Sequence, residues 1–113
     1  MEKIFKVENT DNIIHIQTAD TFFKRFLGLM GRKKLPPATG LLITPCNSIH
    51  MMFMRFSIDA VYIDKNMTVV KVVKNVLPWI GLSMCLKAES VVEMTAGEAE
   101  RLGIVDGVRL VEV

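Results

Sequence analysis

Three residues at helical spacing have the chemistry to bind an anion. Arg25, Gly28 and Arg32 stand at positions i, i+3 and i+7, so an α-helix would place them on one face. A glycine inside a helix costs about 1 kcal/mol relative to alanine, which suggests that backbone or ligand comes close there. The two guanidiniums could then hold a carboxylate or a phosphate. The alternative is that they pair with Asp59 or Glu93 of the same chain.

A histidine and an aspartate in the centre of the chain form a second candidate set. Asp59 opens a strongly apolar stretch, so we expect its carboxylate near the core, where it needs a partner. His50 and Asp59 could act as an acid/base pair. No serine or cysteine is spaced so as to mark a nucleophile. A structural hydrogen bond or salt bridge is therefore the favoured interpretation, and catalysis is the alternative.

Sulfur and imidazole groups around residues 46–54 raise the question of a soft-metal site. If residues 49–54 form a strand, His50, Met52 and Met54 share one face, and Cys46 has the same parity. This set would suit Cu(I), and Cys46, His50 and Cys85 would suit zinc. No paired CxxC or HxxxH spacing is present. We therefore expect no metal, with methionines that fill the core and thiols that behave as small hydrophobes.

An apolar loop carries the single tryptophan. Residues 77–84 read LPWIGLSM, which is unusually apolar for a connection, since a solvated linker would be expected to be rich in Ser, Asn or Asp. Either this loop folds back as a lid on the core, or it offers Trp79 as an anchor for a partner. Glu93 alternates with Val92 and Met94, so we expect it on the solvent face of a strand.

Composition limits the classes of function. The chain has 113 residues, half of them hydrophobic, which predicts one domain (residues 1–113) with an ample core. A net charge of +2 does not demand nucleic-acid binding. The charged N-terminus lacks the apolar stretch of a secretory signal, and no later run would span a membrane. We therefore expect a cytoplasmic protein with free thiols, no nucleic acid and no membrane insertion. No cofactor is indicated.

The elements that must position these residues are mostly strands. Stretches 4–7 and 13–18 predict a hairpin, and apolar spacing predicts a main helix over about 20–34, before Pro36 and Pro37. Stretches 41–44, 49–54, 60–63 and 69–76 predict antiparallel neighbours, with a turn at 64–66. A loop over 77–86, a strand over 90–94, a short helix over about 96–102 and a last strand follow. The predicted class is α+β, mostly β: a small antiparallel barrel or strongly curved sheet.

Separated motifs resemble those of domain-of-unknown-function family 192, small bacterial and archaeal proteins. They are Arg25-x-x-Gly28-Leu29-Met30-x-Arg32, Pro45-Cys46-x-x-Ile49-His50, Met54-Arg55-Phe56-x-Ile58-Asp59 and Val92-Glu93-Met94-x-Ala96-Gly97. Together they cover about residues 19 to 110. The resemblance implies a compact β-rich fold with no assigned reaction, and its pattern includes Arg25, Gly28, Arg32, His50, Met54 and Asp59.

The function itself is not determined by these patterns. We expect a small binding module whose Arg25, Gly28 and Arg32 face, or whose Trp79 loop, receives a small anionic ligand or a protein partner. The alternatives are an enzyme that uses His50 and Asp59 and, less favoured, a soft-metal protein. An enzyme would place these residues around one open cleft, whereas structural residues would be sealed and bonded to each other.

Overall fold

A computed structural model describes residues 2–19, 35–51 and 55–113 of the protein. These residues form mainly strands, with one short helix. The elements are β1 (Glu2–Val7), β2 (Ile13–Ala19), β3 (Thr39–Ile43), β4 (Ser48–His50), β5 (Ile58–Ile63), β6 (Val69–Val76), β7 (Leu82–Met84), β8 (Ser90–Thr95), α2 (Glu98–Leu102) and β9 (Leu110–Glu112).

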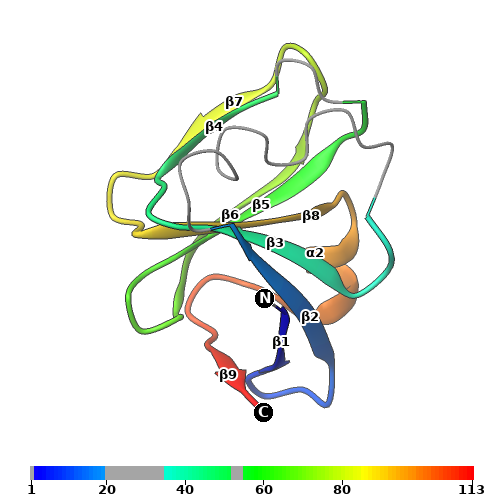
Figure 1. The fold of residues 1–113 in the computed structure, drawn as a ribbon, viewed down its shortest axis with the longest axis vertical. Coiled ribbons are helices and arrows are strands. Elements are labelled where there is room, and N and C mark those ends of the chain that lie inside the picture. Colours follow the sequence, from blue (N-terminus) through cyan, green and yellow to red (C-terminus); the bar gives the residue numbers. More distant parts are fainter. Residues whose placement is uncertain (1, 20–34, 52–54) are drawn as a thin grey trace.

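One strongly curled sheet dominates the molecule (Figure 1). Its strand order is β6-β5-β8-β3-β2-β1-β9, so β6 and β9 are its edges. A bridge between Thr68 and Arg109 links the approaches to these two edge strands, and the Val69 N–H donates to the Val108 carbonyl at 2.8 Å. The sheet is therefore a half-barrel with its edges drawn together, which confirms the predicted mostly β, strongly curved fold.

A second, two-stranded sheet lies on one side of the curled sheet. We call this sheet the ribbon; its strands β4 and β7 run antiparallel (Figure 1). Ile49 of β4 lies opposite Ser83 of β7. Ile49 and Met51 are buried against β5 and β8, in a cluster that includes Tyr62 and Val91. The central strands are thus buried on both faces, because the curl of the sheet encloses a separate apolar cluster on the other side.

Local signals in the sequence predicted local structure correctly. The N-terminal hairpin is present, with Phe5 opposite Ile14. At the predicted turn, Asp64 Oδ1 accepts the N–H groups of Asn66 and Thr68 at 2.8 and 3.0 Å. The short C-terminal helix is confirmed as α2, which begins two residues later than predicted.

Several predictions of longer range were wrong. Of the stretches expected to be antiparallel neighbours, only β5 and β6 pair with each other. β3 pairs parallel with β2 and antiparallel with β8, because the long connection over residues 20–38 can cross from one parallel strand to the next. β4 ends at His50 and pairs with β7, a strand inside the predicted loop 77–86.

The predicted main helix over about 20–34 lies outside the described residues, as do Met52 and Met54. Within the described part of the chain, no helix is long and apolar enough to cross a membrane.

Candidate functional site

The loop between β6 and β7 holds Trp79 in a defined position. The Trp79 N–H donates to the Met51 carbonyl at 2.7 Å, and the Met51 N–H donates to the Gly81 carbonyl at 2.9 Å. Within the loop, the Gly81 N–H donates to the Leu77 carbonyl at 2.9 Å. Trp79 has a φ of 69°, a conformation that a bulky residue adopts only when its surroundings impose it. The backbone that carries Trp79 is therefore fixed before any partner binds.

Gly81 is required for this arrangement. A Cβ at Gly81 would lie 2.4 Å from the Leu77 carbonyl oxygen and 2.6 Å from a Val76 methyl carbon. No other residue type fits without moving the loop backbone. Gly81 therefore packs directly against Val76 and Leu77 at the end of β6, and this contact fixes the shape of the loop.

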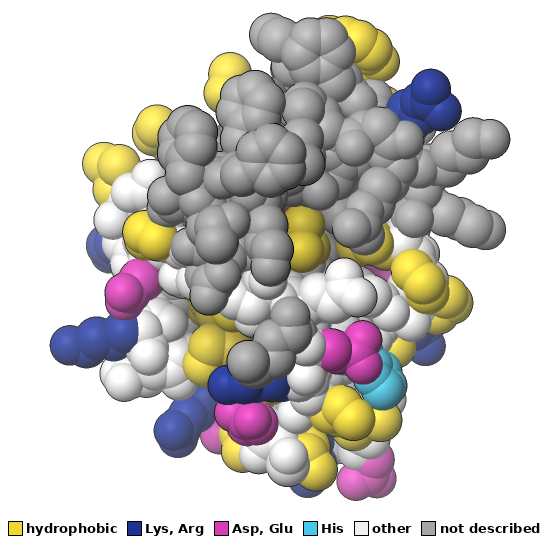
Figure 2. Space-filling model, viewed as in Figure 1, with side chains coloured by type: hydrophobic (Ala, Val, Ile, Leu, Met, Phe, Trp, Pro, Cys, Tyr) yellow, Lys and Arg dark blue, Asp and Glu magenta, His cyan; other side chains and the backbone are white. Residues whose placement is uncertain are grey.

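Large apolar side chains are exposed along this loop and along β7. Ile80 and Leu86 are each 78% exposed, Leu82 75% and Trp79 57%. We call this set the ribbon surface; it consists of Leu77, Trp79, Ile80, Leu82, Met84 and Leu86. Figure 2 shows hydrophobic side chains along the upper left of the molecule, where Figure 1 places β7. Several large apolar side chains exposed on neighbouring positions of one segment indicate an interaction site more often than a single exposed side chain does.

Strand alternation explains how β7 presents two different faces. Ser83 points inward, where its Oγ lies 2.5 Å from the Tyr62 hydroxyl, and its neighbours Leu82 and Met84 point outward. The loop side chains Trp79 and Ile80 are exposed as well. The expectation that this loop closes as a lid on the core is therefore wrong for these two side chains. The alternative, Trp79 offered to a partner, remains open.

A polar group sits beneath the ribbon where the sequence predicted none. Glu93 on β8 is 5% exposed, so its predicted place on the solvent face is wrong. Apolar clusters cover both faces of β8, so neither face of this strand is exposed to solvent and the alternation of its residues does not place Glu93 at the surface. Burial raises the pKa of Glu93 to about 7. None of the hydrogen bonds between described residues ends on its carboxyl group.

Tyr62 lies near Glu93 and both cysteines. Burial raises the pKa of the Tyr62 hydroxyl; Cys46, Cys85 and Glu93 add to the rise electrostatically, while the hydrogen bond with Ser83 opposes it. Both cysteines are half-buried, are not joined by a disulfide, and pack against the apolar cluster under the ribbon. The Cys46 Sγ donates to the Ser48 carbonyl at 3.0 Å.

Asp59 is sealed inside the fold and bonded to backbone. It is 1% exposed, and its Oδ2 accepts the N–H groups of Gly97 and Ala99 at 2.9 and 3.0 Å. Its Oδ1 accepts the Asn75 N–H at 3.0 Å, where β6 carries an irregularity in its pairing with β5. Asp59 therefore ties β6 to the start of α2. It supplies the acceptor that the N-cap residue, Gly97, lacks.

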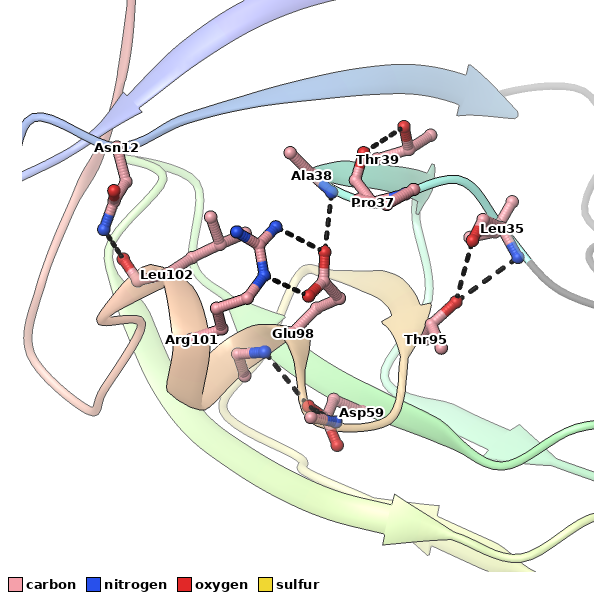
Figure 3. Close-up of polar contacts among 12 residues, drawn as sticks. Asn12, Leu35, Pro37, Ala38, Thr39, Asp59, Thr95, Glu98, Arg101 and Leu102 are labelled. Carbon is pink, nitrogen blue, oxygen red and sulfur yellow. Dashed lines mark hydrogen bonds and ion pairs between the residues drawn. The ribbon is translucent and has the colours of Figure 1, made fainter.

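A second carboxylate fastens the other side of α2 (Figure 3). Glu98 Oε1 accepts the Ala38 N–H at 2.6 Å, and both carboxylate oxygens pair with the Arg101 guanidinium at 2.6 and 2.8 Å. These contacts hold the pKa of Glu98 below its usual range, chiefly through the Arg101 hydrogen bonds. Asp59 and Glu98 together fix the helix between β5 and the start of β3.

The remaining predicted site residues lie wholly or partly outside the described part of the chain. Arg25, Gly28 and Arg32 lie outside the described residues, so the pairing of the two arginines with Asp59 or Glu93, or with an anion, stays a prediction. His50 ends β4, but its side chain is not described, and the proposed acid/base pair and soft-metal sets that include it stay predictions as well. Among the described residues, no three His, Cys, Asp or Glu side chains are grouped to hold a metal.

Comparisons with known proteins identify a matching family and solved structures of the same fold. The sequence profile of DUF192, described as an uncharacterised ACR family, matches residues 4–111. A UPF0127 protein of Pyrococcus furiosus is 35% identical over an alignment of 102 residues, which covers 86% of this chain and 85% of that protein. Another, from Thermococcus sibiricus, is 43% identical over 68 residues, 57% of this chain and 44% of that protein.

Two crystal structures share the fold at low sequence identity. A candidate transcription regulator of Sinorhizobium meliloti superposes with a TM-score of 0.87 at 22% identity, over 98% of this chain and 92% of that one. A protein of unknown function from Novosphingobium aromaticivorans gives 0.84 at 20% identity, over 97% and 83%.

Proposed function

Because the chain belongs to the DUF192 family, whose matched relatives are uncharacterised, we propose its function from the site: it is a binding module that holds a protein partner on the ribbon surface. The observation that carries the proposal is a tryptophan 57% exposed on a backbone fixed by two hydrogen bonds to Met51. A rigid aromatic anchor costs little conformational entropy when a partner covers it.

The energetics favour covering this surface. Apolar surface removed from water contributes about 25 cal/mol per Å², and the ribbon surface presents six large side chains on neighbouring positions. Interface energy concentrates in a few buried residues, with tryptophan among the most frequent. We therefore assign Trp79 as the anchor and Leu82, Met84 and their neighbours as the apolar surround.

The experiment begins with a photoreactive amino acid placed at Leu82, and at Val105 as a control, in living cells. Val105 is 53% exposed but lies between α2 and β9, outside the ribbon surface. A protein cross-linked at Leu82 is then purified, and its affinity is measured by calorimetry for the wild type, Trp79→Ala and Val105→Ala.

We expect Trp79→Ala to weaken binding at least tenfold, on the order of a hot-spot contact, and Val105→Ala to leave it within about twofold. Equal affinities for the two variants, or cross-linking confined to Val105, would refute the proposed function.

We further propose that the protein works in the cytoplasm. Its half-buried cysteines, Cys46 and Cys85, are not joined by a disulfide, the state that a reducing compartment maintains. Fractionation followed by immunodetection tests this location, and recovery from the extracytoplasmic fraction would contradict it.

A further inference from the structure

The segment of the chain that carries the ribbon surface contains lysines and no acidic residue. Residues 65–88, which include β6 and all of the ribbon surface, contain Lys65, Lys71, Lys74 and Lys87 and no Asp or Glu. Lys71, Lys74 and Lys87 are exposed. The whole chain is nearly balanced, with 14 basic and 12 acidic residues, so this segment is locally biased. A partner that meets it gains from negative charge.

One lysine is positioned at the edge of the apolar side chains. Lys71 Nζ donates to the Met84 carbonyl at 3.2 Å, which places an ammonium group beside β7. Lys87 directly follows Leu86 in the chain, three residues beyond Met84, so a second positive charge follows the same end of the strand. The apolar side chains therefore have cationic groups near the Met84 end of β7, an arrangement that matches a segment in which apolar and acidic residues occur together.

The backbone of β7 indicates the conformation of the partner. The Cys85 N–H donates to the Asn47 carbonyl and the Met51 N–H to the Gly81 carbonyl, which sets the phase of the antiparallel ladder. In this phase the N–H and C=O groups of Leu82 point away from β4. No strand of the described chain pairs with that edge of β7. An extended segment could satisfy both groups of Leu82 and lay its side chains beside those of β7.

We propose that the segment bound on the ribbon surface is an extended, acidic polypeptide whose apolar side chains contact Trp79, Leu82 and Met84. This inference rests on the proposed function and specifies the chemistry of the partner. A second copy of the chain fits less well, because a symmetric contact would bring like-charged lysines together. A lipid surface supplies negative charge but no backbone groups for the Leu82 edge.

The test uses a display library of short random peptides. The library is selected on the full-length wild-type protein at low salt, and in parallel on Trp79→Ala and on Lys71→Glu/Lys74→Glu. Circular dichroism first verifies that each variant is folded. Lys3→Glu, which reverses the charge of one exposed lysine on β1, is the control for a charge reversal outside the ribbon surface.

We expect peptides enriched on the wild type to contain Asp or Glu together with Leu, Ile or Val. A synthetic peptide from this pool should bind Lys71→Glu/Lys74→Glu at least tenfold more weakly and Lys3→Glu within about twofold, with an affinity that falls as salt increases. Enriched peptides that depend on Trp79 but show no acidic bias would overturn the inference and leave the proposed function standing. If peptides are enriched equally on the wild type and on Trp79→Ala, both the inference and the proposed function are refuted.

Two further measurements address the other occupants. Sedimentation with vesicles of phosphatidylcholine and phosphatidylserine tests a lipid surface, and light scattering across a concentration series tests self-association. Vesicle binding or a dimer that is lost in Trp79→Ala, without peptide enrichment, would replace the acidic segment as the occupant.

Discussion

Removing the Asp59 carboxylate should destabilise the fold strongly, because this one side chain holds β6 and the start of α2 together. Asp59→Ala leaves three backbone N–H groups, of Asn75, Gly97 and Ala99, without their acceptor. A buried donor without a partner costs about 1–3 kcal/mol, and the Ala99 bond is fully buried while water can reach the other two in part. We expect a loss of about 3–5 kcal/mol, a large share of the roughly 5–15 kcal/mol typical of a domain.

The amide variant separates hydrogen bonding from packing. Asp59→Asn keeps one oxygen, which can still accept from Gly97 and Ala99, but sets its NH₂ group against the Asn75 N–H. It should cost about 1–2 kcal/mol.

Urea unfolding followed by circular dichroism measures both Asp59 variants, with Glu100→Ala on the exposed side of α2 as the control, expected within about 0.5 kcal/mol of wild type. If Asp59→Ala unfolds at the same urea concentration as Glu100→Ala, the role assigned to Asp59 is refuted.

Three other changes have defined outcomes. Glu93→Gln should raise the unfolding free energy by up to about 3 kcal/mol at about pH 8 and leave it unchanged below about pH 4. The folded chain raises the pKa of Glu93 from 4.5 to about 7, so the wild type loses stability as pH rises through this window; parallel pH profiles would contradict this. Gly81→Ala should cost at least about 2 kcal/mol, because its Cβ would meet the Leu77 carbonyl; an unchanged urea midpoint would contradict it. Tyr62→Phe should lower the unfolding free energy by about 1 kcal/mol, because the hydrogen bond to Ser83 is lost. If neither Tyr62→Phe nor Ser83→Ala lowers the unfolding free energy, this hydrogen bond does not contribute to stability.

Local chemistry made part of the fold predictable from the sequence. The Asp64 turn and the N-terminal hairpin depend on residues close in the chain, and both were predicted correctly. The pairing of β4 with β7 and the parallel pairing of β2 with β3 join distant segments. No periodicity encodes such partners, because the same strand pattern fits many neighbours.

The candidate site was predictable only in outline. The apolar composition of residues 77–84 identified the Trp79 loop, but β7 has three residues, too few to show alternation. Asp59 was correctly expected in the core, yet its described partners are backbone N–H groups, which every residue but proline carries. Glu93 was missed although Val91 and Val92 are both apolar, a sign that both faces of its strand are covered.

The most direct test of the ribbon surface is an NMR titration of the ¹⁵N-labelled protein with an acidic peptide selected on the wild type. The chain has one tryptophan, so its indole N–H signal reports on Trp79 without ambiguity. We predict saturable shifts of this signal and of the Leu82 and Met84 amides, with β1 and β9 unperturbed. Shifts confined to β1 and β9, with the Trp79 indole signal unchanged, would contradict the assignment of the ribbon surface as the binding site.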